Sequence, residues 1–143
     1  MSILISPDGL ELIVSGVMLF LIGMLQGVAI EKFKNSRMAL SAHLTAAQSG
    51  MALMIFGVIW SVIDLVGLTG ELAKIALILC LYLIWFGITV SAITGASKAL
   101  PIAGEGYAGS KVSETLVSVL TAIGGLLLIV SCIAILIGLA QSL

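Results

Sequence analysis

The side chain with the clearest chemical potential is His43, the only histidine of the chain. A neutral imidazole can ligate haem iron, and a small uncharged surface beside it suits a flat porphyrin. If His43 begins a helix, four such residues lie within about 40° of it: Ala47, Gly50, Met54 and Gly57. Two interpretations follow from the residues alone. His43 is either an axial haem ligand or an interfacial residue whose polar tip reaches the lipid headgroups.

Other catalytic signatures are absent from the sequence. It has no P-loop, dinucleotide fingerprint, HExxH or GxSxG motif. Cys80 and Cys132 lack CxxC spacing, so both are expected to be buried apolar residues. No Asp or Glu lies at the centre of an apolar run, which argues against a proton pump or an ion-coupled transporter.

The composition identifies the solvent in which these residues must be positioned. Of the 143 residues, 61% are hydrophobic and 9% are charged, whereas about 25% of a soluble domain is charged. A soluble domain, a disordered chain and a coiled coil are therefore excluded. The six scattered Lys and Arg form no basic patch, so nucleic acid is not an expected partner. The chain is expected to fold in membrane lipid.

Four apolar runs without a charged residue can each cross a bilayer as a helix: Leu12 to Ile30, Leu44 to Ile63, Ile75 to Ser97 and Leu116 to Ala140. With their flanking turns they predict helices over residues 12–30, 37–63, 72–98 and 112–140. The predicted fold class is all-α, a four-transmembrane-helix bundle forming a single domain, 1–143. Acidic residues precede the first run where a signal peptide would be basic, so this run is expected to remain as a helix.

The connections carry most of the basic residues. The first connection has three, the third has two and the opposite side has one: Lys32, Lys34 and Arg37; Lys98 and Lys111; and Lys74. This asymmetry predicts that both connections are cytoplasmic and both termini outside, in a bacterial-type inner membrane. Asn35 and Ser36 supply a start signal for the second helix. The glycine-rich residues 102–109 are expected to fold tightly over the cytoplasmic mouth.

Glycines recur at helical spacing within the apolar runs. Gly16, Gly23 and Gly27 share one face of the first helix, and Gly124 and Gly138 share one face of the fourth. Small residues allow the backbones of membrane helices to approach closely, so close packing is the expected role in these two helices. For Gly50 and Gly57 on the second helix, close packing and a smooth groove for a flat ligand fit equally well.

Two segments resemble the signatures of hydroxylaminobenzene mutases, which are four-span membrane proteins more distantly similar to styrene oxide isomerases. Residues 35–44 read NSRMALSAHL, and residues 100–107 read LPIAGEGY. The resemblance covers most of the chain. It implies a small oligomer, a homotrimer in the isomerases, that binds b-type haem through His43. Ferric iron in such proteins serves as a Lewis acid for a redox-neutral rearrangement, which would make His43 the metal ligand.

The resemblance is incomplete at the isomerase substrate clamp. Styrene oxide isomerases have an asparagine six residues after the ligand histidine, where this chain has Ser49. Their asparagine and tyrosine on the third helix align with Ile84 and Ile88. The remaining polar candidates for catalysis are Gln48, Ser49 and Tyr82, and Arg37 is a candidate for pairing with haem propionates. His43 and Ser49 differ by about 120° around one helix, which favours a site shared between protomers.

The expected function is a rearrangement of hydroxylaminobenzene to 2-aminophenol on ferric haem b. A redox-neutral hydroxyl transfer requires no flavin or nicotinamide, and a small aromatic substrate partitions into lipid. Three alternatives remain. The chain isomerises an aryl epoxide such as styrene oxide, it is a non-enzymatic membrane haem-binding protein, or it is a small helical subunit that packs against a partner.

Overall fold

Four long helices form the molecule in a computed structural model that describes residues 5–65 and 67–143. They are α1 (Pro7–Val28), α2 (Ser36–Ile59), α3 (Leu68–Thr94) and α5 (Lys111–Gln141). Three short helices join them: η1 (Ile30–Lys32), η2 (Trp60–Val62) and α4 (Pro101–Gly104). All four long helices are long and apolar enough to cross a membrane, and the described residues contain no strand. The predicted four-helix membrane bundle is confirmed.

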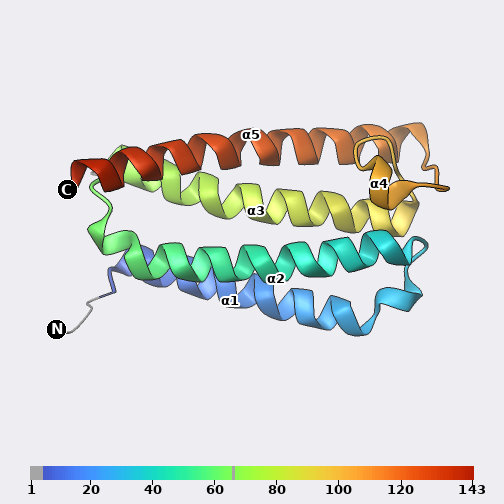
Figure 1. Ribbon diagram of the computed structural model, residues 1–143, viewed down its shortest axis with the longest axis horizontal. Coiled ribbons are helices and arrows are strands. Elements are labelled where there is room, and N and C mark those ends of the chain that lie inside the picture. Colours follow the sequence, from blue (N-terminus) through green and yellow to red (C-terminus); the bar gives the residue numbers. More distant parts are fainter. Residues whose placement is uncertain (1–4, 66) are drawn as a thin grey trace.

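The helices pack in the order of the chain. α1 packs mainly on α2, α2 packs next on α3, and α5 packs mainly on α3. Figure 1 shows the start of α1 and the end of α5 at one end of the bundle, and α4 with the α1–α2 and α3–α5 connections at the other end. The two basic connections therefore share one end of the molecule, here called the α4 end. The end that carries the chain termini is called the terminal end.

The helix ends follow local capping chemistry. α1 begins at Pro7, ahead of the expected Leu12, because Ser6 accepts a hydrogen bond from the Gly9 N–H and the acidic first turn is helical. The expected cap of α2 is confirmed, since the Asn35 side chain accepts from the Met38 N–H at 3.0 Å. α3 ends at Thr94, short of the expected residue 98, because Gly95 adopts a left-handed conformation with φ of 79°.

The glycines of α1 bring its backbone against α2, as expected. A Cβ atom on Gly16 would lie 2.6 Å from the Gly50 carbonyl oxygen, and one on Gly57 would lie 2.5 Å from the Gly9 carbonyl oxygen. Glycine is therefore required on both sides of this contact. Of the two interpretations for α2, close packing is confirmed, and α1 fills the place of the alternative groove.

A glycine of α5 makes a similar close contact with α3, but a smaller share of the α5 surface is buried than in the other three long helices. A Cβ on Gly124 would lie 2.7 Å from Ile84 Cγ1 and 3.1 Å from the Cys80 carbonyl oxygen, which confirms close packing there. Cys80 is buried, whereas Cys132 is exposed on α5. The expectation that both cysteines are buried is thus wrong for Cys132, because α5 packs mainly on one neighbour and leaves its other side facing outward.

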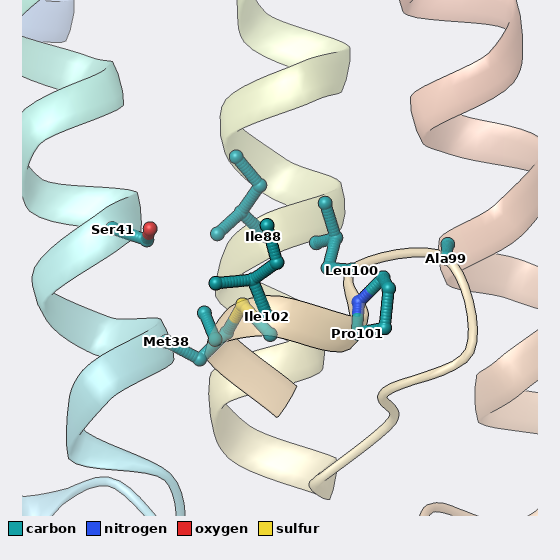
Figure 2. A pocket seen from close by; sticks show the side chains of 8 residues that line it. Met38, Ser41, Ile88, Ala99, Leu100, Pro101 and Ile102 are labelled. Atoms are coloured by element: carbon teal, nitrogen blue, oxygen red, sulfur yellow. The ribbon is translucent and has the colours of Figure 1, made fainter. Parts of the chain in front are cut away.

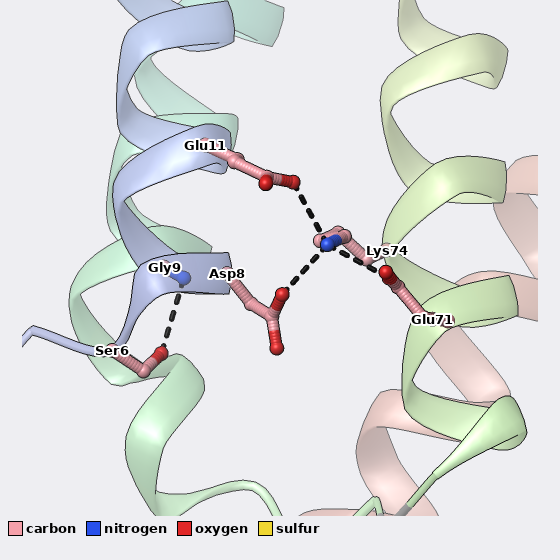
Figure 3. Close-up of polar contacts among 6 residues, drawn as sticks. All are labelled: Ser6, Asp8, Gly9, Glu11, Glu71 and Lys74. Carbon is pink, nitrogen blue, oxygen red and sulfur yellow. Dashed lines mark hydrogen bonds and ion pairs between the residues drawn. The ribbon is translucent and has the colours of Figure 1, made fainter.

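An ion-pair cluster joins α1 to α3 at the terminal end (Figure 3). The Lys74 side chain is only 5% exposed, and its Nζ lies 2.6 Å from Asp8, 2.8 Å from Glu11 and 2.7 Å from Glu71. Asp8 and Glu11 belong to α1, and Glu71 belongs to the first turn of α3. A buried ammonium needs such partners, because desolvating an unpaired charge is costly. This cluster fixes α1 beside α3 far from the α4 end.

Candidate functional site

His43 is half-buried on α2 and is held by α1. Its Nδ1 lies 2.7 Å from the Gly23 carbonyl oxygen. A carbonyl oxygen only accepts hydrogen bonds, so Nδ1 carries the proton and donates. In the neutral ring the lone pair then lies on Nε2, for which the described residues show no hydrogen-bond partner. This is the arrangement by which metal-binding histidines are oriented through their second nitrogen.

Gly27 makes room for the imidazole. A Cβ on this glycine would lie 2.8 Å from both Cε1 and Nδ1 of His43. The glycine spacing of α1 therefore has two consequences: Gly16 and Gly23 allow the backbones to approach, and Gly27 admits the ring. The sequence alone predicted only the first of these.

The small-residue surface expected beside His43 is largely covered. Gly50 is buried, and a Cβ on it would lie 2.6 Å from the Gly16 carbonyl oxygen and 2.9 Å from Phe20 Cβ. Ala47 and Met54 are half-buried at the edge of this contact. In the single chain the small surface beside His43 is therefore not open at Gly50, because the glycine face of α1 packs against it. Only its edge, with His43, Ala47 and Met54, is accessible.

The expected catalytic residues are dispersed. Gln48 is exposed on α2, and Ser49 beside it is buried. Tyr82 on α3 donates its hydroxyl hydrogen to the Ser15 carbonyl oxygen of α1 at 2.9 Å, and its ring meets Trp85 edge to face. Within one chain, these three side chains do not gather around His43.

Arg37 contacts the loop between α3 and α5. It is exposed, and its Nη2 donates to the carbonyl oxygen of Glu105. It precedes His43 by six residues, a rotation of about 120° around α2. The guanidinium therefore belongs to a different face of α2 from the imidazole, and a pairing with propionates stays a prediction.

A cavity of about 370 Å³ lies at the α4 end, between α2, α3 and the α4 segment. Figure 2 shows Ser41 of α2, Ile88 of α3 and the loop residues around it. The lining is apolar except for the Ser41 hydroxyl: Met38, Ser41, Ile88, Ala99, Leu100, Pro101, Ile102 and Ala103. Such a lining suits a small neutral molecule that has an apolar body and one polar group.

The outer wall of this cavity is held by directed hydrogen bonds. The buried Glu114 carboxylate accepts from the N–H groups of Ser97, Lys98 and Gly109, at 3.0 to 3.1 Å. Asn35 Nδ2 donates to the Ala103 carbonyl oxygen at 2.9 Å. The two ends of the loop, at Ser97 and Gly109, and its centre, at Ala103, are therefore held by hydrogen bonds. The expected tight fold of the glycine-rich connection over this end of the bundle is confirmed.

Sequence reasoning missed a second polar group inside the bundle, Gln26 of α1. Trp85 Nε1 donates to Gln26 Oε1 at 2.8 Å, and Gln26 Nε2 donates to Thr89 Oγ1 at 3.2 Å. A signal was present, because Gln26 is the only amide side chain in the first apolar run. An amide in hydrocarbon needs hydrogen-bond partners at both of its ends, and this holds for Gln26 as it does for Gln48.

Comparison with known proteins identifies the family. A family model described as styrene oxide isomerase matches residues 9–140. Hydroxylaminobenzene mutase HabA of Ectopseudomonas oleovorans is 32% identical over 110 residues, covering 76% of this chain and 82% of the relative. Hydroxylaminobenzene mutase HabB of the same organism is 29% identical over 114 residues, covering 79% and 70%. No solved structure matches significantly. Since the matched region extends from α1 to α5, the chain belongs to the styrene oxide isomerase family and is an isomerase.

Proposed function

We propose that the protein is a membrane-bound mutase that rearranges hydroxylaminobenzene to 2-aminophenol, with b-type haem held by His43. The observation that carries the haem assignment is the His43 hydrogen bond, because it orients the ring and leaves Nε2 available as a ligand. The substrate assignment is supported by the names of the two mutase relatives.

The residues around His43 fit a group that would take a single imidazole from the protein and bring its other ligands with it. No cluster of three or more His, Cys, Asp or Glu is found among the described residues, so side chains alone do not enclose a metal ion there. A porphyrin needs only the imidazole and an apolar edge, and Ala47 and Met54 supply the edge. When bound, ferric haem supplies a Lewis acid that eases cleavage of a polar bond to oxygen.

The proposed reaction is balanced without a second substrate. The N–O bond of the hydroxylamine breaks, a C–O bond forms at the ortho carbon, and the hydrogen of that carbon ends on nitrogen. The chain's own residues bind the ring and exclude water. The apolar cavity beside α4 has room for a single aromatic ring, with the Ser41 hydroxyl for its polar substituent. Because Ser41 and His43 lie about 160° apart around α2, the haem that serves this cavity is proposed to be held by His43 of a neighbouring copy. Exclusion of water matters because water competes for an electrophilic ring.

The site is proposed to be completed by a second copy of the chain, in a homotrimer. Gln48 lies exposed among Leu44, Met51 and Ile55, which are 47%, 45% and 61% exposed. An amide on an outward apolar face needs a polar partner, and another protomer supplies one. In such an oligomer, the accessible edge of a neighbouring copy, formed by its His43, Ala47 and Met54, would lie against the exposed α2 face around Gln48. Gln48 and Ser49 are the proposed polar contributors to such a shared site.

Aryl epoxide isomerisation is the second candidate function, favoured by the description of the matching family model. The same cofactor would act on an epoxide oxygen. The apolar Ile88 in the cavity favours the mutase, because a hydroxylamine brings its own N–H and O–H donors and requires fewer from the protein.

The decisive experiment supplies hydroxylaminobenzene to the purified haem-loaded protein in ¹⁸O-labelled water. Retention of ¹⁶O in 2-aminophenol is expected for intramolecular transfer, whereas ¹⁸O in the product would mean that water attacks the ring. His43→Ala is expected to lose both the Soret band and turnover, because it removes the ligand. Haem-loaded wild type with no aminophenol above the His43→Ala background would reject the mutase, and styrene oxide tested in parallel decides between enzyme and simple haem-binding protein.

A further inference from the structure

We propose that Gln26 is a positioning residue for His43. It does not touch the imidazole. It bonds α1 to α3 at the same turn of α1 whose Gly23 carbonyl accepts the His43 hydrogen bond, and thereby fixes the orientation and tautomer of the ring. The role of the ring rests on the proposed function, but the test below measures the imidazole directly.

The first observation is a closed set of neutral hydrogen bonds between α1 and α3. Gln26 is 8% exposed. Its Oε1 accepts from Trp85 Nε1 at 2.8 Å, and its Nε2 donates to Thr89 Oγ1 at 3.2 Å. Thr89 Oγ1 in turn donates to the Trp85 carbonyl oxygen at 2.9 Å. The amide is therefore held at both of its ends, on two successive turns of α3.

The second observation is that the same turn of α1 holds the imidazole. Gly23 accepts from His43 Nδ1, and the ring lies against Gly27, directly after Gln26 in the chain. This turn presents glycines to α2 and an amide to α3. Glycines have no side chain to resist rotation of the helix, and lipid gives no hydrophobic drive for helix association. Apart from the His43 bond itself, the directional contact in this turn is therefore the Gln26 amide.

A small rotation of α1 is enough to release His43. Backbone atoms lie about 2.3 Å from a helix axis, so a rotation of about 20° moves a carbonyl oxygen by about 0.8 Å. Such a shift takes the 2.7 Å contact between His43 and Gly23 to the limit of hydrogen-bonding distance. Once the Nδ1 bond is lost, either ring nitrogen can carry the proton, and Nε2 is no longer reserved as a ligand.

The test uses the single histidine of the chain. In the full-length protein, labelled with ¹⁵N-histidine and reconstituted without haem, every imidazole signal comes from His43. Wild type is expected to show one species, protonated at Nδ1 and bare at Nε2. Gln26→Met keeps a similar side-chain volume without hydrogen bonds, and is expected to lower the ratio of Nδ1–H to Nε2–H tautomer at least tenfold. Thr89→Val is expected to give a smaller change, and Thr89→Ser, which keeps the hydroxyl, to restore the wild-type spectrum.

Asp8→Asn is the matched control, because it weakens the contact between α1 and α3 at the terminal end, away from the Gly23 turn. It is expected to leave the imidazole spectrum unchanged. An unchanged spectrum in Gln26→Met, or an equal change in Asp8→Asn, would overturn the proposal. If Gln26→Met does not fold, the Thr89 pair carries the test.

Failure of this inference is distinguishable from failure of the proposed function. A wild type that binds no haem, but whose tautomer responds to Gln26→Met, rejects the haem ligand and keeps the positioning role. If haem is lost in His43→Ala but the imidazole spectrum is unchanged in Gln26→Met, the haem ligand is kept and the positioning role is rejected. If both hold, the iron–histidine stretching frequency of the loaded protein is expected to shift in Gln26→Met and not in Asp8→Asn.

Discussion

The two ends of the bundle are fastened by different chemistry. At the terminal end, Lys74 holds three carboxylates from two helices, and the contacts are between charges on side chains. At the α4 end, Glu114 holds three backbone N–H groups, and Asn35 holds a backbone carbonyl. Charges on flexible side chains adjust to small shifts, whereas N–H groups converging on one carboxylate require one particular loop conformation. The terminal end is therefore a clamp between helices, and the α4 end shapes a cavity.

The largest expected effect comes from breaking the clamp. Lys74→Met leaves three carboxylates facing one another, and should lower the free energy of unfolding by about 2 kcal/mol, below the range for a broken buried pair, because the charges left behind are half-exposed and not buried. Unfolding in mixed detergent micelles measures this loss. Lys98→Met, exposed at the α4 end, is the control and should change stability by less than about 0.5 kcal/mol. Equal effects of the two substitutions would contradict the distinction between the ends.

The next effect concerns the wall of the cavity. Glu114→Gln replaces one acceptor oxygen by a donor, so the loop loses part of its support. We expect the KM for hydroxylaminobenzene to rise about tenfold, equivalent to about 1.4 kcal/mol, with kcat nearly unchanged. Amide exchange at Ser97, Lys98 and Gly109 should accelerate in the same variant. Thr115→Val, whose hydroxyl bonds only to Lys111 of its own helix, is the control. A fall in kcat at constant KM would refute a role confined to the wall.

The smallest effect is expected from single cysteine substitutions, which test the side of the membrane that each end of the bundle faces. We propose that the α4 end is cytoplasmic and both termini are outside, in an inner membrane, because basic residues gather in the two connections at the α4 end. Ser36 lies at the α4 end and Ser61 at the other, and both are exposed. In intact cells, an impermeant thiol reagent should label Ser61→Cys and spare Ser36→Cys. The reverse pattern would invert the orientation, and the unsubstituted chain gives the background.

Features that depend on one segment could be predicted from the sequence. The four spans follow from runs without charge, the α2 cap from Asn35, and the close approach of α1 from its glycine spacing. The helix bounds differed where charge was used as a boundary. Asp8 and Glu11 were placed outside the first helix, but their charges are satisfied by Lys74, so the acidic turn remains helical.

Features that depend on which faces meet could not be predicted. The small face around Gly50 has the same composition whether it binds a porphyrin or another helix, and only the pairing with α1 distinguishes the two. The same holds for Tyr82, whose hydroxyl bonds to a backbone carbonyl that no side-chain pattern identifies. The acceptor for His43 is likewise a backbone atom, on a residue with no side chain.

The glycine contact between α1 and α2 has a consequence for biosynthesis. These two helices precede α3 and α5 in the chain and so leave the ribosome before them, and their glycine contact involves no residue of α3 or α5. The helical hairpin can therefore assemble in the bilayer while the second half of the chain is still being translated. His43 meets the Gly23 carbonyl within this hairpin, so the imidazole acquires its partner during insertion. The cavity, by contrast, awaits α3 and the loop that follows it.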